Sequence, residues 1–216
     1  MDANDELKAV AGQIVKCTGC KLNTSRKLAV PGEGAADAEV MFIGEGPGFY
    51  ENEQGRPFVG QAGRFLDELL QKAGCKRAQV FITNVVKCRP PGNRDPELDE
   101  LQACAAYLDR QIEIINPLVI VTLGRFSMAR YFPTARISSI HGKPAWVDGR
   151  FIVPMYHPAA ALHQASLKSA VVEDFSRLAG FILEARKKRA AQQAAARPPE
   201  PEPEKPSDQA TQLSLF

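Results

Sequence analysis

The segment from Gly44 to Gly60 constrains the fold of this chain more strongly than any other stretch of its sequence. It follows a short apolar run, Val40–Ile43, which is typical of a buried β-strand. Glycines and prolines inside the segment disfavour regular structure, and helical spacing of apolar residues resumes only at Gln61. The pattern predicts a strand, a long loop and a helix in succession. Ligands bind at such strand ends in open α/β sheets, although a purely structural connection is the alternative.

Apolar runs along the rest of the chain alternate with segments of helical periodicity. The predicted strands cover residues 39–44, 79–85, 118–123 and 151–155. The predicted helices cover residues 5–16, 61–73, 97–115, 125–131 and 167–190. Because the strands are continuous apolar runs, they indicate a parallel sheet covered on both faces. The expected fold is α/β, a three-layer α/β/α sandwich with a central four-stranded, mainly parallel sheet.

The chain has 216 residues and a formal net charge of +2, which fits one domain followed by a tail. We expect the domain over residues 1–189 and a disordered linker, rich in Pro, Ala and Glu, over 190–208. Residues 209–216 end in an apolar pentapeptide, Gln212-Leu213-Ser214-Leu215-Phe216, which suggests a partner-binding motif. No run is apolar and long enough to span a membrane, and the first residues do not resemble a signal peptide. We therefore expect a cytoplasmic protein with no membrane partner.

Five cysteines in a chain expected in the reducing cytoplasm favour metal or cluster ligation over disulfides. Cys17 and Cys20 form a C-x2-C pair, whereas Cys88 follows the second predicted strand and Cys104 lies on the next helix. Four thiolates suit a tetrahedral zinc ion or a four-iron cluster, and the spacing alone does not decide between them. Two pairs of unrelated buried thiols are the third possibility. Cys75 is expected to be a structural or free thiol.

Polar side chains lie at or just past the carboxyl ends of three of the predicted strands. Glu45, Asn84 and His157 should therefore converge on one cleft. The amide of Asn84 offers a donor and an acceptor to a base edge, and His157 is suited to stabilise an oxygen on which charge develops. Phe58 is suited to stack on a flat ring. Each residue also has an ordinary structural interpretation, but together they predict a pocket for a planar, polar heterocycle.

The loop after the second predicted strand is basic. It contains Lys87, Arg89 and Arg94. Because cationic side chains commonly contact the phosphates that flank a recognised base, we expect these three to bind DNA phosphates.

Four segments of the chain, found in order between residues 5 and 185, closely resemble family 4 uracil-DNA glycosylases, the iron–sulfur members of their superfamily. The segments are Gly44-Glu45-Gly46-Pro47-Gly48, Gly55-Arg56-Pro57-Phe58-Val59-Gly60, Thr83-Asn84-Val85-Val86-Lys87-Cys88-Arg89-Pro90-Pro91 and His157-Pro158-Ala159-Ala160. The resemblance implies a uracil-DNA glycosylase-like fold and a monofunctional hydrolase without a nucleotide cofactor. Such an enzyme flips uracil out of DNA, hydrolyses its N-glycosidic bond and leaves an abasic site, which initiates base excision repair.

The resemblance also assigns roles to residues of the predicted cleft. Phe58 would stack on uracil, Asn84 would bond its polar edge, and His157 would stabilise charge on uracil O2. Leu162 would wedge into the duplex in place of the flipped base. A structural 4Fe-4S cluster would be held by Cys17, Cys20, Cys88 and Cys104.

The first motif differs from that of the best-known uracil glycosylases, which carry a water-activating Asp where this chain has Gly46. Glu45, or stabilisation of the leaving group, would then contribute more to catalysis. Glu51 matches an acidic position that excludes the methyl group of thymine. Phe49 and Tyr50 stand where family members usually have an acidic cluster.

The C-terminal pentapeptide resembles bacterial sliding-clamp-binding peptides, whose Leu and Phe side chains fill an apolar groove. Together the resemblances imply a monomeric, nucleoid-associated repair enzyme that acts on uracil in single- or double-stranded DNA and is tethered to the clamp through its linker. One alternative is a clamp-tethered, weakly or non-catalytic damaged-DNA-binding protein. Another is a zinc-binding nucleotide hydrolase on the same sheet architecture.

Overall fold

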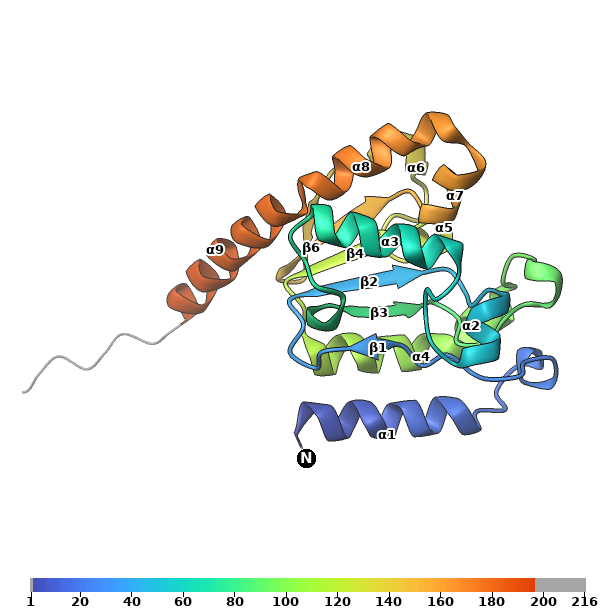
Figure 1. The fold of residues 1–216 in the computed structure, drawn as a ribbon. Helices are drawn as coiled ribbons and strands as arrows, with labels where there is room; N and C mark the ends of the chain where they lie inside the picture. The colour runs from blue at the N-terminus through green and yellow to red at the C-terminus, as the bar shows by residue number, and fades with distance from the viewer. Residues whose placement is uncertain (1, 197–216) are drawn as a thin grey trace, which may run out of the picture.

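A six-stranded mixed sheet forms the centre of the computed structural model, which describes residues 2–196 (Figure 1). The strand order is β1-β3-β2-β4-β6-β5. The strands are β1 Glu33–Gly34, β2 Val40–Gly44, β3 Phe81–Asn84, β4 Val119–Leu123, β5 Ala145–Val147 and β6 Arg150–Met155. The central four, β3, β2, β4 and β6, are parallel and are the four strands expected from the sequence. Strands β1 and β5 are short antiparallel edges that the sequence did not predict.

Helices cover both faces of this sheet, which confirms the three-layer arrangement. The α-helices are α1 Ala3–Lys16, α2 Phe49–Gln54, α3 Gln61–Lys72, α4 Leu98–Ile115, α5 Arg125–Ala129, α6 Ile137–Ile140, α7 Pro158–His163, α8 Lys168–Ser176 and α9 Leu178–Ala196. The 3₁₀ segments are η1 Lys21–Thr24, η2 Arg77–Gln79, η3 Pro91–Asn93 and η4 Ala165–Leu167. Helices α3, α8 and α9 contribute to the core on one face and α4 on the other, with α1 packed against α4.

Three features differ from the sequence-based expectation. The glycine-rich loop, expected to lack regular structure, contains the six-residue helix α2. The single helix expected over 167–190 is two helices, α8 and α9, separated at Arg177. Helix α9 continues to Ala196, past the start of the predicted linker at residue 190. The rest of that linker and the predicted clamp-binding pentapeptide lie outside the described residues.

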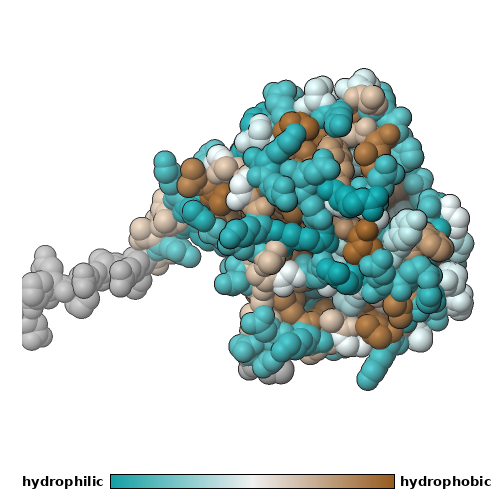
Figure 2. All heavy atoms as spheres, in the orientation of Figure 1, coloured by the Kyte–Doolittle hydropathy of each residue, from teal (hydrophilic) through white to brown (hydrophobic). Residues whose placement is uncertain are grey.

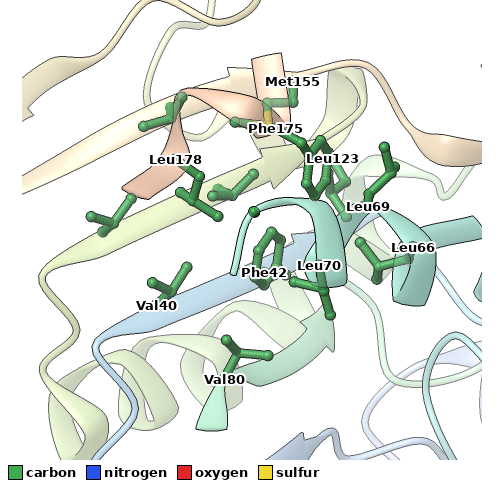
Figure 3. Close-up of a cluster of buried hydrophobic side chains, with 14 of the residues drawn as sticks. Val40, Phe42, Leu66, Leu69, Leu70, Val80, Leu123, Met155, Phe175 and Leu178 are labelled. Carbon is green, nitrogen blue, oxygen red and sulfur yellow. The ribbon is translucent and has the colours of Figure 1, made fainter. Parts of the chain in front are cut away.

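Alternation along the buried strand β2 divides the core between the two faces of the sheet. Val40 and Phe42 pack on the α3/α8 side, whereas Met41 and Ile43 pack on the α4 side. Figure 3 shows the first side, where the rings of Phe42 and Phe175 stack with centroids 5.9 Å apart. Because all four β2 side chains are buried, the strand that leads into the glycine-rich loop is fixed on both faces.

The carboxyl ends of the four parallel strands meet at one edge of the sheet, near α2, α5 and α7 (Figure 1). Backbone bonds from Val85 N to Gly44 O (3.0 Å) and from Val86 N to Glu45 O (3.2 Å) continue the pairing beyond the ends of β2 and β3. The two motif loops are thereby held together. The surface in Figure 2 is mostly hydrophilic, with hydrophobic residues in small patches. No α-helix within residues 2–196 is apolar and long enough to cross a membrane.

Candidate active site

A pocket of about 170 Å³ lies at the carboxyl edge of the sheet. Its walls come from the glycine-rich loop, the start of α3, the end of β3 and the loop into α7. The lining residues are Gly46, Gly48, Glu51, Phe58, Ala62, Asn84, His157 and Ala159. The structure thus brings together all five residues predicted to contact substrate. Gly48, Ala62 and Ala159 also line the pocket but received no role from the sequence, because small side chains carry no chemical signature.

Asn84 presents an unused amide to this pocket. Its side chain is buried, and Oδ1 has no hydrogen-bond partner among the described residues. Gly44 lies beside it in the β2–β3 register, and a Cβ there would come within 2.3 Å of Asn84 Oδ1 and 2.8 Å of the Phe58 ring. A buried amide without a partner is destabilising unless a ligand supplies the missing bond. The pocket is therefore built to receive a group that donates a hydrogen bond to it.

Phe58 is held in a strained backbone conformation against the same pocket. Its φ angle is 49°, in the left-handed region that non-glycine residues rarely adopt. Gly63 on α3 makes the close packing possible, since a Cβ at that position would lie 1.9 Å from the Phe58 carbonyl oxygen. The Phe58 ring stacks with the His157 ring, with centroids 5.4 Å apart and an interplanar angle of 24°. The helix start thus fixes an aromatic ring beside the amide of Asn84.

The hydrogen bonds of His157 define its tautomer. Nδ1 accepts a hydrogen bond from the backbone amide of Ala159 at 3.1 Å and caps α7. Nε2 of the neutral ring therefore carries the hydrogen and is the donor. Burial lowers the pKa of His157 to about 4, although the Glu51 carboxylate opposes this shift. At neutral pH the residue is an uncharged donor in the wall of the pocket.

Glu51 is anchored in another part of the pocket wall. Its Oε1 accepts hydrogen bonds from the backbone amides of Val59 (2.9 Å) and Gly60 (3.1 Å). A Cβ on Gly48 would lie 2.7 Å from Oε2, so this glycine gives the carboxylate its space. The acid is consequently a rigid part of the pocket.

Glu45 does not line the pocket, contrary to the position expected of a catalytic acid. Its Oε1 accepts a hydrogen bond from the backbone amide of Phe126 at 3.2 Å, at the start of α5. Gly124 lies so close that a Cβ there would be 2.5 Å from the carboxylate. Burial raises the pKa of Glu45. The side chain is therefore bonded to the start of α5, and its catalytic role stays a prediction.

Lys87 cannot contact a phosphate, so its predicted role in DNA binding is wrong. Its side chain is buried, and Nζ lies within hydrogen-bond distance of Thr83 Oγ1 (2.6 Å), Gln111 Oε1 (2.7 Å) and the Asn84 carbonyl oxygen (2.9 Å). Three acceptors match the three hydrogens of an ammonium group, although burial lowers the pKa of Lys87 to about 7. Lys87 instead ties the end of β3 to helix α4.

The other predicted DNA-binding residues have different surroundings. Arg94 forms a two-point ion pair with the buried Glu100 (2.8 and 2.6 Å), which also caps α4, so its guanidinium has a structural partner. Arg89 is half-buried and donates from Nε to Asn93 Oδ1 at 2.8 Å. Leu162 is exposed on α7, the helix that contributes Ala159 to the pocket. Arg89 and Leu162 thus remain available to an outside ligand.

The four predicted ligand cysteines line a second cavity, between α1, α4 and the loop after β3. They are free thiols, and no group of three or more His, Cys, Asp or Glu within residues 2–196 is placed to hold a single metal ion. Burial raises the pKa of Cys104 to about 11 and also raises that of Cys88. Cys75 lies elsewhere, beside the core under α3. The topology thus gathers both halves of the cysteine set around one space.

Two groups donate hydrogen bonds to these sulfurs. Gly19 N lies 3.3 Å from Cys17 Sγ, and Arg26 Nη1 lies 3.1 Å from Cys88 Sγ. Tyr107 lines the same cavity, and the neighbouring Cys17 raises the pKa of the tyrosine to about 12. Donors of this kind suit sulfurs that carry negative charge, as in an iron–sulfur cluster. Neither Arg26 nor Tyr107 was predicted from the sequence to lie beside these cysteines, although Tyr107 follows Cys104 by one helical turn, a spacing that predicts neighbouring positions.

Comparison with known proteins agrees with this geometry. A family model described as the uracil DNA glycosylase superfamily matches residues 31–177. A type-4 uracil-DNA glycosylase of Sulfurisphaera tokodaii is 48% identical over 184 residues, which cover 81% of this chain and 84% of the relative. A type-4 uracil-DNA glycosylase of Thermotoga maritima is 43% identical over 181 residues, which cover 82% and 94%. A type-5 uracil-DNA glycosylase of Pyrobaculum aerophilum is 30% identical over 148 residues, which cover 60% and 65%. The chain belongs to the uracil-DNA glycosylase superfamily and, within it, to the type-4 uracil-DNA glycosylases.

Proposed function

We propose that this protein is a uracil-DNA glycosylase that hydrolyses the bond between uracil and deoxyribose in DNA and starts base excision repair. The single observation that carries the proposal is the buried amide of Asn84, whose Oδ1 has no hydrogen-bond partner within residues 2–196, in a pocket beside an aromatic ring and a neutral histidine. This set matches the polar edge, the flat face and the O2 atom of a flipped uracil. The family of the chain supports the same activity.

Recognition of the base follows from the fixed positions of Phe58 and Asn84. The aromatic ring offers a flat apolar surface, and the amide supplies an acceptor for uracil N3–H and a donor for O4. Glu51, fixed by two backbone amides, is proposed to occupy the C5 side and to exclude the methyl group of thymine. Gly46 leaves room near the sugar, because no side chain projects there.

Bond cleavage is proposed to rest on stabilisation of the leaving group. As the N-glycosidic bond breaks, its electron pair moves into the uracil ring and negative charge develops on O2. The Nε2–H of neutral His157 is proposed to donate a hydrogen bond to this oxygen. Because the Glu45 carboxylate is engaged at α5, we assign the water no side-chain base of its own. Water adds to the electron-poor sugar carbon and loses a proton to solvent.

An excision assay tests this function directly. Purified protein is incubated with oligonucleotides that carry uracil in U:G pairs, in U:A pairs or in single strands, and free uracil is measured. We expect release of uracil and an alkali-labile abasic site, with thymine left intact. Tight binding of uracil-containing DNA without release would favour the alternative, a damaged-DNA-binding protein with little or no catalysis.

We further propose that a structural 4Fe-4S cluster is held by Cys17, Cys20, Cys88 and Cys104. The shared cavity and the donors to two of its sulfurs support this proposal. When bound, the cluster would join α1 to α4 and to the loop after β3. Anaerobically purified protein should be brown and contain iron and sulfide, and Cys104→Ser should lose both. Cys75→Ser, the matched control, should keep them, whereas a colourless, zinc-loaded wild-type protein would contradict the proposal.

The C-terminal pentapeptide, residues 212–216, is proposed to bind the bacterial sliding clamp. Its sequence supports this, with two Leu and a terminal Phe after a Pro-rich linker. Deletion of 212–216 should abolish binding to purified clamp and leave excision from short DNA unchanged. Deletion of residues 207–211, which keeps the pentapeptide, is the matched control. Clamp binding that survives the first deletion would refute this part of the proposal.

A further inference from the structure

Two large aromatic side chains are exposed at the rim of the proposed uracil pocket. Phe49 and Tyr50, the first residues of α2, are 54% and 59% exposed. The residues on either side of them, Gly48 and Glu51, both line the pocket. Exposed aromatic surface in contact with water is unfavourable, so a pair of such rings beside a binding pocket indicates a partner. The proposed function leaves both rings without a role.

The two rings and a nearby arginine form one surface. The Phe49 and Tyr50 rings meet edge to face, with centroids 5.4 Å apart and an interplanar angle of 84°. The Arg89 guanidinium lies 5.3 Å from the centroid of the Phe49 ring, in cation–π geometry. Tyr50 also packs near Gly60, where a Cβ would lie 3.4 Å from its ring. The surface is therefore aromatic and carries a positive charge at its edge.

The location of this surface indicates what it contacts. Helices α2 and α7 lie at the same edge of the sheet, α2 below and α7 above in Figure 1. Each helix contributes to the pocket, and each exposes apolar side chains, Phe49 and Tyr50 on α2 and Leu162, 40% exposed, on α7. A DNA strand whose uracil enters the pocket must pass between these two sides. A neighbouring nucleotide of that strand then lies against α2.

We propose that Phe49 and Tyr50 form a stacking subsite for the nucleobase next to the flipped uracil in the same DNA strand, with Arg89 contacting the adjoining phosphate. This inference rests on the proposed function. When uracil leaves the stack, its neighbour loses a stacking partner, and an aromatic ring replaces it. Such stacking tolerates any base because every base has a flat face. The gain is largest on single strands, where no complementary strand holds the neighbouring base in place.

Cross-linking with wild-type protein tests the location directly. The probe is a single-stranded oligonucleotide with an uncleavable 2′-fluoro-deoxyuridine and with 4-thiothymine on its 5′ side, its 3′ side or several nucleotides away. We expect one of the two adjacent probes to cross-link to Phe49 or Tyr50, as mapped by mass spectrometry, and the distant probe to give no such product. Cross-links from both adjacent positions that map to other segments would overturn the proposal.

Binding measurements test the energetics with the same uncleavable DNA. Alanine substitution of both Phe49 and Tyr50 should weaken binding to the single strand by about 5- to 100-fold. Phe49→Trp, which keeps a stacking ring, should bind within a few-fold of wild type. Leu183→Ala is the matched control, since Leu183 is 55% exposed on the distant helix α9. If the double alanine variant binds the strand with wild-type affinity, the proposal is overturned. This is also the result expected if the two rings bind a protein partner and not DNA.

The salt dependence of binding distinguishes the contribution of Arg89 from that of the two aromatic rings. Arg89→Ala should reduce the slope of log binding constant against log salt by about 0.7, the value for one phosphate of a single strand. The double alanine variant should keep the wild-type slope, because the rings carry no charge. Excision by the wild-type protein is measured on the matching uracil strand. Absence of excision would refute the proposed function, whereas the cross-link and the binding constants report on the stacking subsite without any bond cleavage.

Discussion

The buried ammonium group of Lys87 donates a hydrogen bond to the backbone carbonyl oxygen of Asn84, with Nζ and O 2.9 Å apart. This contact joins the two centres of the molecule. Asn84 lines the proposed uracil pocket, and Lys87 precedes Cys88, which lines the cysteine cavity. Gln111 on α4 accepts a second bond from the same ammonium group and donates to the Pro31 carbonyl oxygen at 2.7 Å. One buried lysine thus holds the turn that carries residues of both sites.

Replacement of Lys87 by Met should destabilise the protein and impair the pocket together. Methionine has a similar volume, but it leaves three buried oxygens without their donor, at a cost of about 2–4 kcal/mol. We expect a melting temperature lower by roughly 5–15 °C and at least about tenfold slower excision, since the Asn84 backbone loses its anchor. Calorimetry and the uracil-release assay measure the two effects. Lys72→Met, on the exposed surface of α3, should change neither, and a similar response of both variants would contradict this view of Lys87.

Replacement of Asn84 by Ala should separate activity from stability. Because its Oδ1 has no partner in the described structure, removal of the amide breaks no internal hydrogen bond at that atom and should leave the melting temperature within a few degrees of wild type. Excision should fall by at least about 100-fold, because the polar edge of uracil then enters a pocket that offers it no partner. Rates under single-turnover conditions are the measurement. A variant that is strongly destabilised, or that retains wild-type rates, would be inconsistent with the assigned role.

Much of the pocket was predictable from the sequence because its chemistry stands at the ends of apolar strands. Asn84 lies at the end of a predicted strand and His157 just past another, and Phe58 belongs to the glycine-rich loop between a predicted strand and a predicted helix. Parallel strands bring such positions to one edge of the sheet, whatever the detailed packing. Local sequence patterns were therefore sufficient to predict the strands and the meeting of these side chains at one edge of the sheet. The short edge strands β1 and β5 escaped prediction because two or three residues cannot display a periodicity.

Two side chains of the predicted sites have partners that are distant in sequence. Lys87 is two residues from Arg89 and looks like part of a basic surface. Its side chain is instead buried and donates a hydrogen bond to Gln111 on α4. Glu45 follows a strand as expected, but its carboxylate accepts a hydrogen bond from the backbone amide of Phe126 at the start of α5. Both outcomes depend on which partner lies across the fold, and no local pattern encodes that. The same limit explains why Arg26 was not recognised as a donor to Cys88.

The pKa of His157 predicts how acid affects the protein. The folded-state value of about 4 lies below the ordinary value of 6.5, so between these limits the unfolded chain binds a proton that the native chain does not. The contribution of His157 to stability is therefore retained above about pH 6.5 and falls as pH decreases toward 4. His157→Gln should weaken the pH dependence of the melting temperature in this window, whereas the exposed His163→Gln should leave this contribution unchanged. NMR titration of the His157 ring with a midpoint near 6.5 would contradict the assignment.

Two helical glycines offer a matched test of the backbone strain at Phe58. A Cβ at Gly63 on α3 would lie 1.9 Å from the Phe58 carbonyl oxygen and 2.2 Å from its carbon, so Gly63→Ala must displace the strained residue. We expect a loss of about 1–3 kcal/mol in the free energy of unfolding, with weaker binding of uracil because the ring moves from its place beside His157. A Cβ at Gly12 on α1 would meet no atom within 4 Å, so Gly12→Ala should stabilise the protein by about 0.5–1 kcal/mol. Urea denaturation measures the free energy of unfolding of the two variants. If the close approach of α3 holds Phe58 in place, this free energy decreases for Gly63→Ala and increases for Gly12→Ala. A Gly63→Ala variant with the stability and uracil binding of wild type would show that the pocket does not depend on this close packing.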